Sequence, residues 1–206
     1  MYTFSIKSNT AKDKEKKVVL SLVPKSLFIF FIISFFSLLL SAFEETDENT
    51  VSAILTAKVE APFNENAPIS NARIIVINSL GTVIGTELTN FEGEANIPVT
   101  VHKDPRFPMK NMGEVTVIAV ANGYNEHINF SVPINELNDN STRVSVPLWN
   151  IDPNRRNEPQ FLNGSFHRFT VFAMLDYYAE KVGLKRQEIT VDIGKEPPWS
   201  SELRVD

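Results

Sequence analysis

The sequence predicts an all-β fold, a sandwich of seven strands with an apolar helical segment before it and a helical appendage after it. Two observations support this prediction. Between residues 52 and 149, short segments of alternating apolar residues recur between clusters of Pro, Gly, Asn and Asp. Seven such segments at this spacing are typical of two packed antiparallel sheets. The chain has no Cys, so the packed core must stabilise the fold without disulfides.

The amino-terminal segment has the charge pattern of an exported or membrane-anchored protein. Residues 1–26 are rich in Lys, the unbroken apolar run Leu27 to Phe43 follows, and residues 44–51 form an acidic linker. Positive charge before the run predicts a cytoplasmic amino terminus and an extracytoplasmic remainder. The run exceeds a signal-peptide core of about 7 to 15 residues and just reaches the length of a spanning helix. Retention as a single-pass anchor in the cell membrane and cleavage of a signal, giving a secreted protein, therefore both stay open.

The seven strands are predicted from period-2 alternation and from the turns between them. In the last strand, for example, Val144, Val146 and Leu148 alternate with more polar neighbours, which indicates one buried face. Ser79-Leu80-Gly81 and the segment from Asn90 to Gly93 both predict hairpin turns, because Asn and Gly tolerate positive φ. The expected strands are residues 52–61, 72–78, 82–88, 94–99, 114–121, 126–132 and 142–149.

Four short motifs occur in the order seen in a known family. They are Ala67-Pro68-Ile69-Ser70-Asn71-Ala72-Arg73-Ile74, Thr89-Asn90-Phe91-Glu92-Gly93, Ile97-Pro98-Val99 and Asn122-Gly123-Tyr124. From about Ile54 to Leu148 the chain resembles the carboxypeptidase regulatory-like domain, which has a transthyretin-like (prealbumin-like) sandwich. The resemblance implies an accessory role in scaffolding, adhesion or cell-surface binding. Two departures are Asn71, where Gly is common, and the long loop at residues 100–113.

The carboxy-terminal part is predicted to be a separate appendage. Residues 150–160 form a polar linker, and residues 161–206 contain a helix from Ser165 to Val182, capped by Asn163 or Ser165 and ended by Gly183. One further strand is expected at residues 187–193, and residues 195–206 are expected to be irregular.

The predicted helix has apolar side chains on two nearly opposite faces. Such a helix needs two partners, because burying one face leaves the other exposed. The β domain and the chain's own tail, a second copy or another envelope protein, and the membrane surface are the alternatives. The candidate partner-binding residues are Phe166, Phe169, Val171, Phe172, Leu175 and Tyr178.

Few residues could support catalysis. The chain has three His, and His102 with Asp104 is the nearest approach to a catalytic or metal-binding pair. Phosphate-binding loops, nucleophile elbows and zinc helices are absent from the sequence, so no cofactor and no metal is expected. The net charge of −5 disfavours a nucleic-acid partner.

These observations predict a non-enzymatic extracytoplasmic module that binds or supports another macromolecule in a cell-surface or envelope assembly. The anchor residues 27–43 would contact the membrane, and the carboxy-terminal helix would contact a protein partner or a second copy. The alternative is an exported hydrolase of the transthyretin-like fold that uses His102 and Asp104.

Overall fold

A computed structural model describes residues 49–136, 140–152, 154, 157–189 and 196–205. The predicted cytoplasmic segment, the apolar run at residues 27–43 and residues 44–48 of the acidic linker lie outside the described residues. Within the described part, no helix is both long and apolar enough to cross a membrane.

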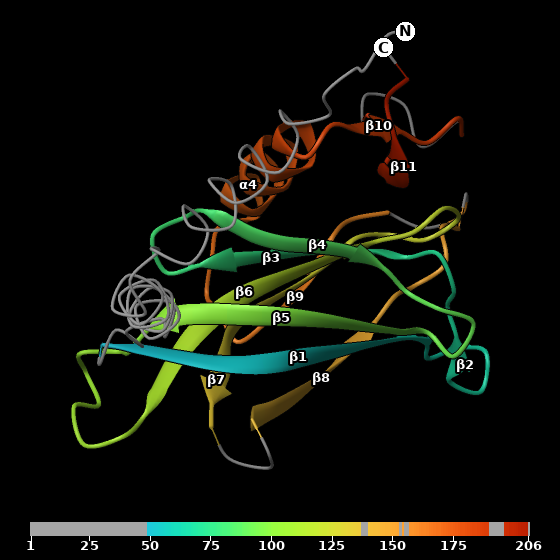
Figure 1. Ribbon diagram of the computed structural model, residues 1–206. Coiled ribbons are helices and arrows are strands. Elements are labelled where there is room, and N and C mark those ends of the chain that lie inside the picture. The colour runs from blue at the N-terminus through green and yellow to red at the C-terminus, as the bar shows by residue number, and fades with distance from the viewer. Residues whose placement is uncertain (1–48, 137–139, 153, 155–156, 190–195, 206) are drawn as a thin grey trace, which may run out of the picture. The chain divides into compact units, whose positions relative to one another are not determined.

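Two sheets pack face to face (Figure 1). In the first, the long central strand β1 pairs antiparallel with β5 and parallel with β8. Its strands are β1 (Thr50–Ala61), β2 (Ala67–Pro68), β5 (Glu94–His102) and β8 (Ser141–Pro147). The second sheet has the order β4-β3-β6-β7-β9, with β4 (Val83–Leu88), β3 (Arg73–Asn78), β6 (Met112–Val120), β7 (His127–Asn135) and β9 (Gln160–Leu162). Each of the seven expected strand segments overlaps one of these strands, and the short strands β2 and β9 were not predicted.

The space between the sheets is filled by aliphatic side chains from alternating positions. Leu55 and Val59 of β1 face Ile74 and Val76 of β3, and all four are fully buried. A period of two is what a strand needs to send every second side chain to one face. Burial of this face supplies most of the apolar stabilisation that a chain without disulfides requires.

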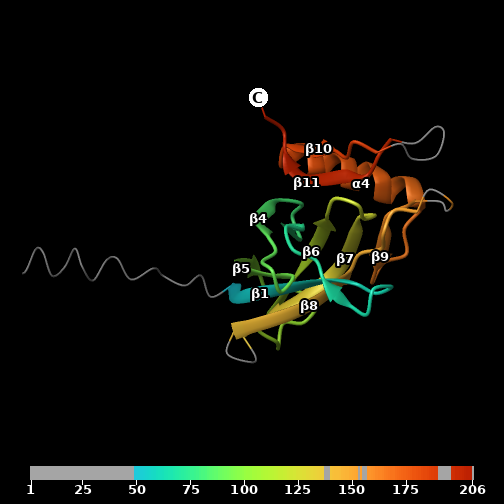
Figure 2. The same cartoon turned by 90° about the vertical axis from the view of Figure 1, so that its right-hand side faces the viewer.

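The second sheet is buried on its outer face as well. Ile75 and Ile77 of β3 and Ile118 and Val120 of β6 point away from the first core into a second one. The helix α4 (Arg168–Lys181) and the antiparallel pair β10 (Leu184–Arg186) and β11 (Trp199–Leu203) cover this face, so the fold has three layers (Figure 2). The predicted carboxy-terminal appendage is therefore packed on the sandwich and completes its burial.

Helix α4 begins later than predicted. His167 is the N-cap and its ring nitrogen accepts from the backbone N–H of Phe169, whereas Asn163 and Ser165 lie outside the helix. The predicted stop is confirmed, because Gly183 has a φ of 77° directly after the last turn.

The tail after the helix differs from the prediction. Strand β10 ends at Arg186, so the strand expected at residues 187–193 is wrong for its described part, and residues 190–193 lie outside the described residues. The stretch expected to be irregular contains β11. The Gln187 side chain ties this segment to the sandwich: it donates to the carbonyls of Ala121, Tyr124 and Trp199 and accepts from the N–H of Gly123.

The two predicted hairpin turns have different outcomes. Ser79 to Gly81 does join the antiparallel strands β3 and β4, and Gly81 has a φ of 76°. The turn from Asn90 to Gly93 does have Gly at positive φ, 75°, but it joins β4 of one sheet to β5 of the other. It is a crossing between the layers of the sandwich, and the hairpin prediction there is wrong.

Candidate functional site

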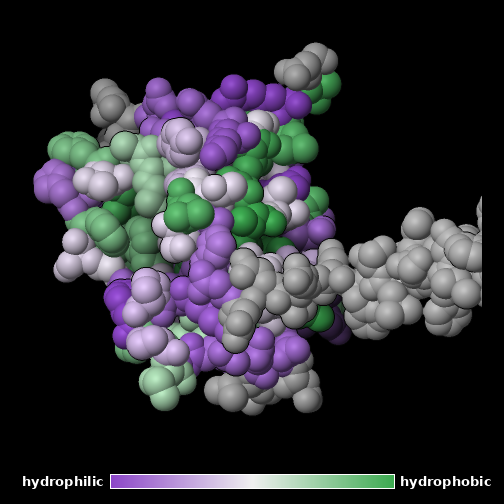
Figure 3. Space-filling model, turned by 60° about the vertical axis from the view of Figure 1, so that its left-hand side comes forward, coloured by the Kyte–Doolittle hydropathy of each residue, from purple (hydrophilic) through white to green (hydrophobic). Residues whose placement is uncertain are grey.

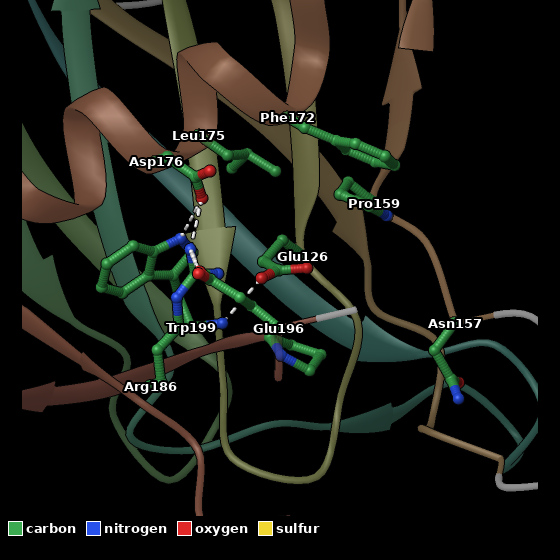
Figure 4. A pocket seen from close by; sticks show the side chains of 10 residues that line it. Glu126, Asn157, Pro159, Phe172, Leu175, Asp176, Arg186, Glu196 and Trp199 are labelled. Atoms are coloured by element: carbon green, nitrogen blue, oxygen red, sulfur yellow. Dashed lines mark hydrogen bonds and ion pairs between the residues drawn. The ribbon is translucent and has the colours of Figure 1, made fainter. Parts of the chain in front are cut away.

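A pocket of about 160 Å³ opens between the start of β7, the middle of α4 and the segment before β11 (Figure 4). One wall is apolar, and the other carries carboxylates with one guanidinium. The lining residues are Glu126, Asn157, Pro159, Phe172, Leu175, Asp176, Arg186, Glu196, Pro198 and Trp199. The pocket exists only because the tail folds back on the second sheet, so elements from three parts of the chain meet there.

Arg186 organises the charged wall. Its Nη2 atom lies 2.7 Å from Asp176 Oδ1 and 2.6 Å from Glu196 Oε2, and its guanidinium stacks on Trp199 with 3.8 Å from Cζ to the ring centroid. The indole N–H of Trp199 donates to the same Asp176 oxygen at 2.9 Å. The orientation of each of these side chains is therefore set by at least one neighbour, as recognition sites require.

Glu126 lies at the centre of the pocket, below Leu175 and Phe172 in Figure 4. It is only 4% exposed, and its Oε1 accepts from the backbone N–H of Trp199 at 2.7 Å. Burial raises the pKa of Glu126 above its ordinary value, although the N–H groups of Trp199 and of Glu126 itself and the charge of Arg186 act in the opposite direction. No basic side chain in the described part forms an ion pair with this carboxylate, because Arg186 pairs with Asp176 and Glu196.

An aromatic surface adjoins the pocket at the amino-terminal end of α4; we define it as Phe166, Phe169 and Phe172. Phe166 and Phe169 are 46% and 64% exposed, while Phe172 is half-buried and also lines the pocket. The guanidinium of Arg168 lies over Phe169 and Phe172, at 5.2 and 5.3 Å from the ring centroids, and forms an ion pair with Glu158. Apolar side chains also reach the surface elsewhere, in patches separated by polar ones on the face that Figure 3 presents.

The structure divides the six predicted partner-binding residues into two groups. Phe166, Phe169 and Phe172 form the aromatic surface. The other three, Val171, Leu175 and Tyr178, are 2%, 2% and 9% exposed and pack in the second core, where Leu175 also lines the pocket. The sheet beneath α4 thus covers one of its two apolar faces, while Tyr177 on the other is 56% exposed.

Asp104 of the predicted His102 and Asp104 pair is bound by Arg106. Arg106 donates to both carboxylate oxygens of Asp104, with Nη2 2.6 Å from Oδ2, and also pairs with Glu114. These hydrogen bonds hold the pKa of Asp104 below its ordinary value. Asp104 therefore fastens the loop between β5 and β6, and the carboxylate that a neighbouring imidazole would need is already occupied.

A different histidine occupies an unusual position. His127 is 2% exposed, and neither ring nitrogen has a hydrogen-bond partner among the described residues. Burial lowers the pKa of His127 to about 4, and the nearby carbonyl of Pro147 opposes this only weakly. Its ring is neutral at physiological pH, but the enclosure leaves neither nitrogen accessible to a substrate or a metal ion from solvent. In the described part no three His, Asp or Glu side chains gather closely enough to hold a metal ion.

Phe172 and Leu175 of the pocket were among the predicted binding residues, whereas Glu126 and Trp199 were not, although two signals were present. Glu126 is a charged residue immediately before the apolar Ile128 and Phe130 positions of β7, on the face that became the second core. Trp199 is a large aromatic residue inside a stretch expected to be irregular. Each would have suggested burial, but neither would have indicated that the two meet.

No family model matches the chain, and no curated protein matches it. Among solved structures, the TIE protein of Bacillus anthracis is 21% identical over 49% of this chain and 18% of its own, with a TM-score of 0.39. A 3-chlorocatechol 1,2-dioxygenase from Rhodococcus opacus is 12% identical over 52% of this chain and 63% of its own, with a TM-score of 0.36. A shaft pilin from Lactobacillus rhamnosus GG is 13% identical over 50% of this chain and 52% of its own, with a TM-score of 0.33.

The chain thus spans less than two thirds of each of these proteins. At such TM-scores the likeness carries no information about activity. The class that the coordinates define is an all-β sandwich with a helical third layer, and the membership in the carboxypeptidase regulatory-like family stays a prediction.

Proposed function

We propose that this chain is a non-enzymatic extracytoplasmic binding module, held at the membrane by residues 27–43 or secreted, which binds a basic protein partner through the aromatic surface and the adjoining pocket. The family resemblance to carboxypeptidase regulatory-like domains, with their accessory roles, points in the same direction. The observation that carries the proposal is the exposure of Phe166 and Phe169, at 46% and 64%, beside a pocket with fixed polar groups.

Exposed aromatic residues at one end of a helix are costly to leave in water. Phe and Trp are enriched in the centres of protein interfaces, where burying a ring contributes more than burying most other side chains. Phe166 is held by Phe130, with 4.5 Å between ring centroids, and Arg168 lies over Phe169. The rings are therefore partly ordered before binding, which reduces the entropy lost on association.

The charge of the chain favours a basic partner over a second copy. Residues 1–48 contain six Lys and six Asp or Glu, so the remaining residues carry the whole net charge of −5. Two acidic surfaces repel each other, whereas a basic surface is attracted and steered to the site.

The proposal can be tested by photo-crosslinking on cells that express the full chain. A photoreactive phenylalanine placed at Phe166 or Phe169 should give an adduct of one defined mass with an extracytoplasmic protein. The same amino acid at Tyr177, which is 56% exposed on the same helix, is the matched control and should give none. Phe169→Ala should reduce the adduct formed from position 166 by about tenfold, as expected for a residue at the centre of an interface.

Two results would contradict the proposal. One is the absence of an adduct from positions 166 and 169 under conditions in which a control pair of proteins crosslinks. The other is an equal yield from position 177, which would mean that the adducts report random collisions.

A further inference from the structure

Glu126 is a buried acidic group that no basic side chain pairs with in the described part of the chain. A carboxylate that is 4% exposed loses most of its hydration, and proteins normally recover that cost with a counter-ion or several hydrogen bonds. Here Oε1 has the Trp199 N–H, whereas the other oxygen faces the pocket and receives no hydrogen bond from another described residue. A buried acceptor directed into open space indicates a ligand that brings donors or positive charge.

The pocket as a whole has more acidic than basic side chains. Asp176, Glu196 and Glu126 contribute three carboxyl groups, and Arg186 contributes the one cation among the lining residues. Arg186 is held in place by its stacking on Trp199 and by a hydrogen bond to the Pro197 carbonyl at 3.1 Å, so it cannot turn toward Glu126 without losing these contacts. A second cation would therefore meet one carboxyl group without a counter-ion and two carboxylates that share Arg186.

The shape of the pocket restricts what that cation can be. Phe172, Leu175 and Pro159 form an apolar wall beside the carboxyl groups, and a volume of about 160 Å³ is on the order of that of one long side chain. Lys and Arg combine an apolar stem with a charged end, which matches a pocket with one apolar and one acidic wall.

We infer that the pocket receives a Lys or Arg side chain of the protein partner, whose charged end binds Glu126 while its stem packs on Phe172 and Leu175. This inference rests on the proposed function, because Phe172 belongs to both the pocket and the aromatic surface and so places the incoming residue within the same interface. The partner is the source of the cation because the pocket opens beside exposed rings that only a macromolecule could cover.

The inference is tested with the full chain in detergent micelles and a small probe, N-acetyl-lysine methylamide. The chain has two Trp, so labelling with ¹⁵N-tryptophan gives two indole resonances, assigned with a Trp149→Phe variant. The Trp199 indole N–H donates to Asp176 at 2.9 Å and should shift saturably with the lysine probe. The Trp149 resonance should not shift. N-acetyl-norleucine methylamide, which has a similar stem without the charge, should leave both resonances unchanged.

Substitutions then locate the binding. Glu126→Gln keeps the oxygen that accepts from Trp199, and Glu196→Gln changes a side chain that is 76% exposed. Each should weaken binding of the lysine probe, by about tenfold for Glu126→Gln, since hydrogen bonds to charged groups are worth more than neutral ones. Glu180→Gln, an exposed carboxylate of α4 outside the pocket, is the matched control and should change the affinity less than about twofold.

Three results would overturn the inference: no saturable shift of Trp199, an equal shift with the norleucine probe, or unchanged affinity in both pocket variants. If Glu126→Gln disturbs the fold, seen as a collapsed spread of resonances without probe, Glu196→Gln decides. These outcomes are separate from those of the crosslinking experiment. A partner that crosslinks at Phe169 while the probe fails to bind would leave the proposed function standing and remove the basic side chain from the pocket.

Discussion

At the scale of single residues, Gly93 shows how one position fixes the crossing between the sheets. Its φ of 75° lies in the left-handed region, and a Cβ there would lie 2.6 Å from the Val59 carbonyl oxygen and 3.0 Å from Cβ of Pro68. Gly123 also has a positive φ, 85°, but a Cβ there would meet nothing within 4 Å. A side chain at either position would strain the backbone, but only a side chain at position 93 would also overlap with neighbouring atoms.

We predict that Gly93→Ala destabilises the domain by about 2 to 4 kcal/mol, and Gly123→Ala by about 1 kcal/mol, because only the first adds a clash to the cost of positive φ. Chemical denaturation followed by circular dichroism measures both. Equal losses for the two variants would mean that the space around Gly93 is not limiting.

His127 gives the domain a predictable response to acid. Its pKa is lowered from 6.5 to about 4 by burial, so the unfolded chain binds a proton at a pH where the folded chain does not. Stability from this group is thus complete above about pH 6.5 and is lost as the pH falls toward 4, by about 3 kcal/mol in all. His127→Leu should remove this part of the pH dependence.

The measurement is the free energy of unfolding between pH 4 and 7 for the natural chain and for His127→Leu. Glu126 acts in the opposite direction, because its raised pKa makes it bind a proton on folding, and stability from that group is lost as the pH rises through its folded pKa. The same measurement on the Glu126→Gln variant, which lacks this titrating group, serves as the control for the contribution of Glu126 to the pH dependence. A natural chain whose stability is constant from pH 6.5 to 4 would contradict the buried neutral histidine.

At the scale of elements, helix α4 covers the second core. Val171, Leu175 and Tyr178 lie against Ile75, Ile77 and their neighbours on the outer face of the second sheet. Tyr178 also donates to the Gly81 carbonyl at 3.2 Å, which joins the helix to the hairpin turn between β3 and β4. The helix is therefore part of the folded domain.

We predict that Leu175→Ala lowers the stability of the domain by about 2 to 4 kcal/mol, as a cavity in a packed core does. Tyr177→Ala, two residues further along α4 at a position that is 56% exposed, should cost less than about 1 kcal/mol. A thermal or denaturant melt compares the two variants. A loss for Leu175→Ala no larger than for Tyr177→Ala would mean that α4 packs only loosely on the sheet.

The elements differ in how far the sequence predicts them. The long strands were found because alternation and turn residues are local signals, and Gly183 marked the end of α4 for the same reason. Strands β10 and β11 were missed because they are short and pair across more than ten residues, and because Gln187 ties them to the sandwich by hydrogen bonds to distant residues. Burial on both faces of β3 was not predicted. The uninterrupted apolar run Ile74-Ile75-Val76-Ile77 is the local signal for it.

The candidate site was predictable only in part. Phe166, Phe169 and Phe172 were identified because aromatic residues that cluster on a predicted helix are visible in the sequence. Glu126 and Trp199 were not, because the hydrogen bond between them joins residues 73 positions apart. The sequence also does not show which of the two apolar faces of α4 is covered, because that depends on how distant segments pack on the helix.

At the scale of the whole molecule, the charge distribution around the apolar run sets the expected topology. Lys-rich residues precede the run and acidic residues follow it, so the described domain should lie outside the cytoplasm. Protease added to intact cells should then remove the β domain while a cytoplasmic marker survives. A β domain that survives until the cells are opened would reverse the orientation.

The central position of β1 affects how the domain would respond to a mechanical load. If the segment before Thr50 holds the chain at a membrane and a partner pulls on α4, the load enters at one end of β1. That strand is central: residues 54–58 pair with β5 on one side and with β8 on the other. A pull along the axis of the strand would load these hydrogen bonds together, because they run across the strands. A central strand held on both sides in this way would resist such a pull more than an edge strand would.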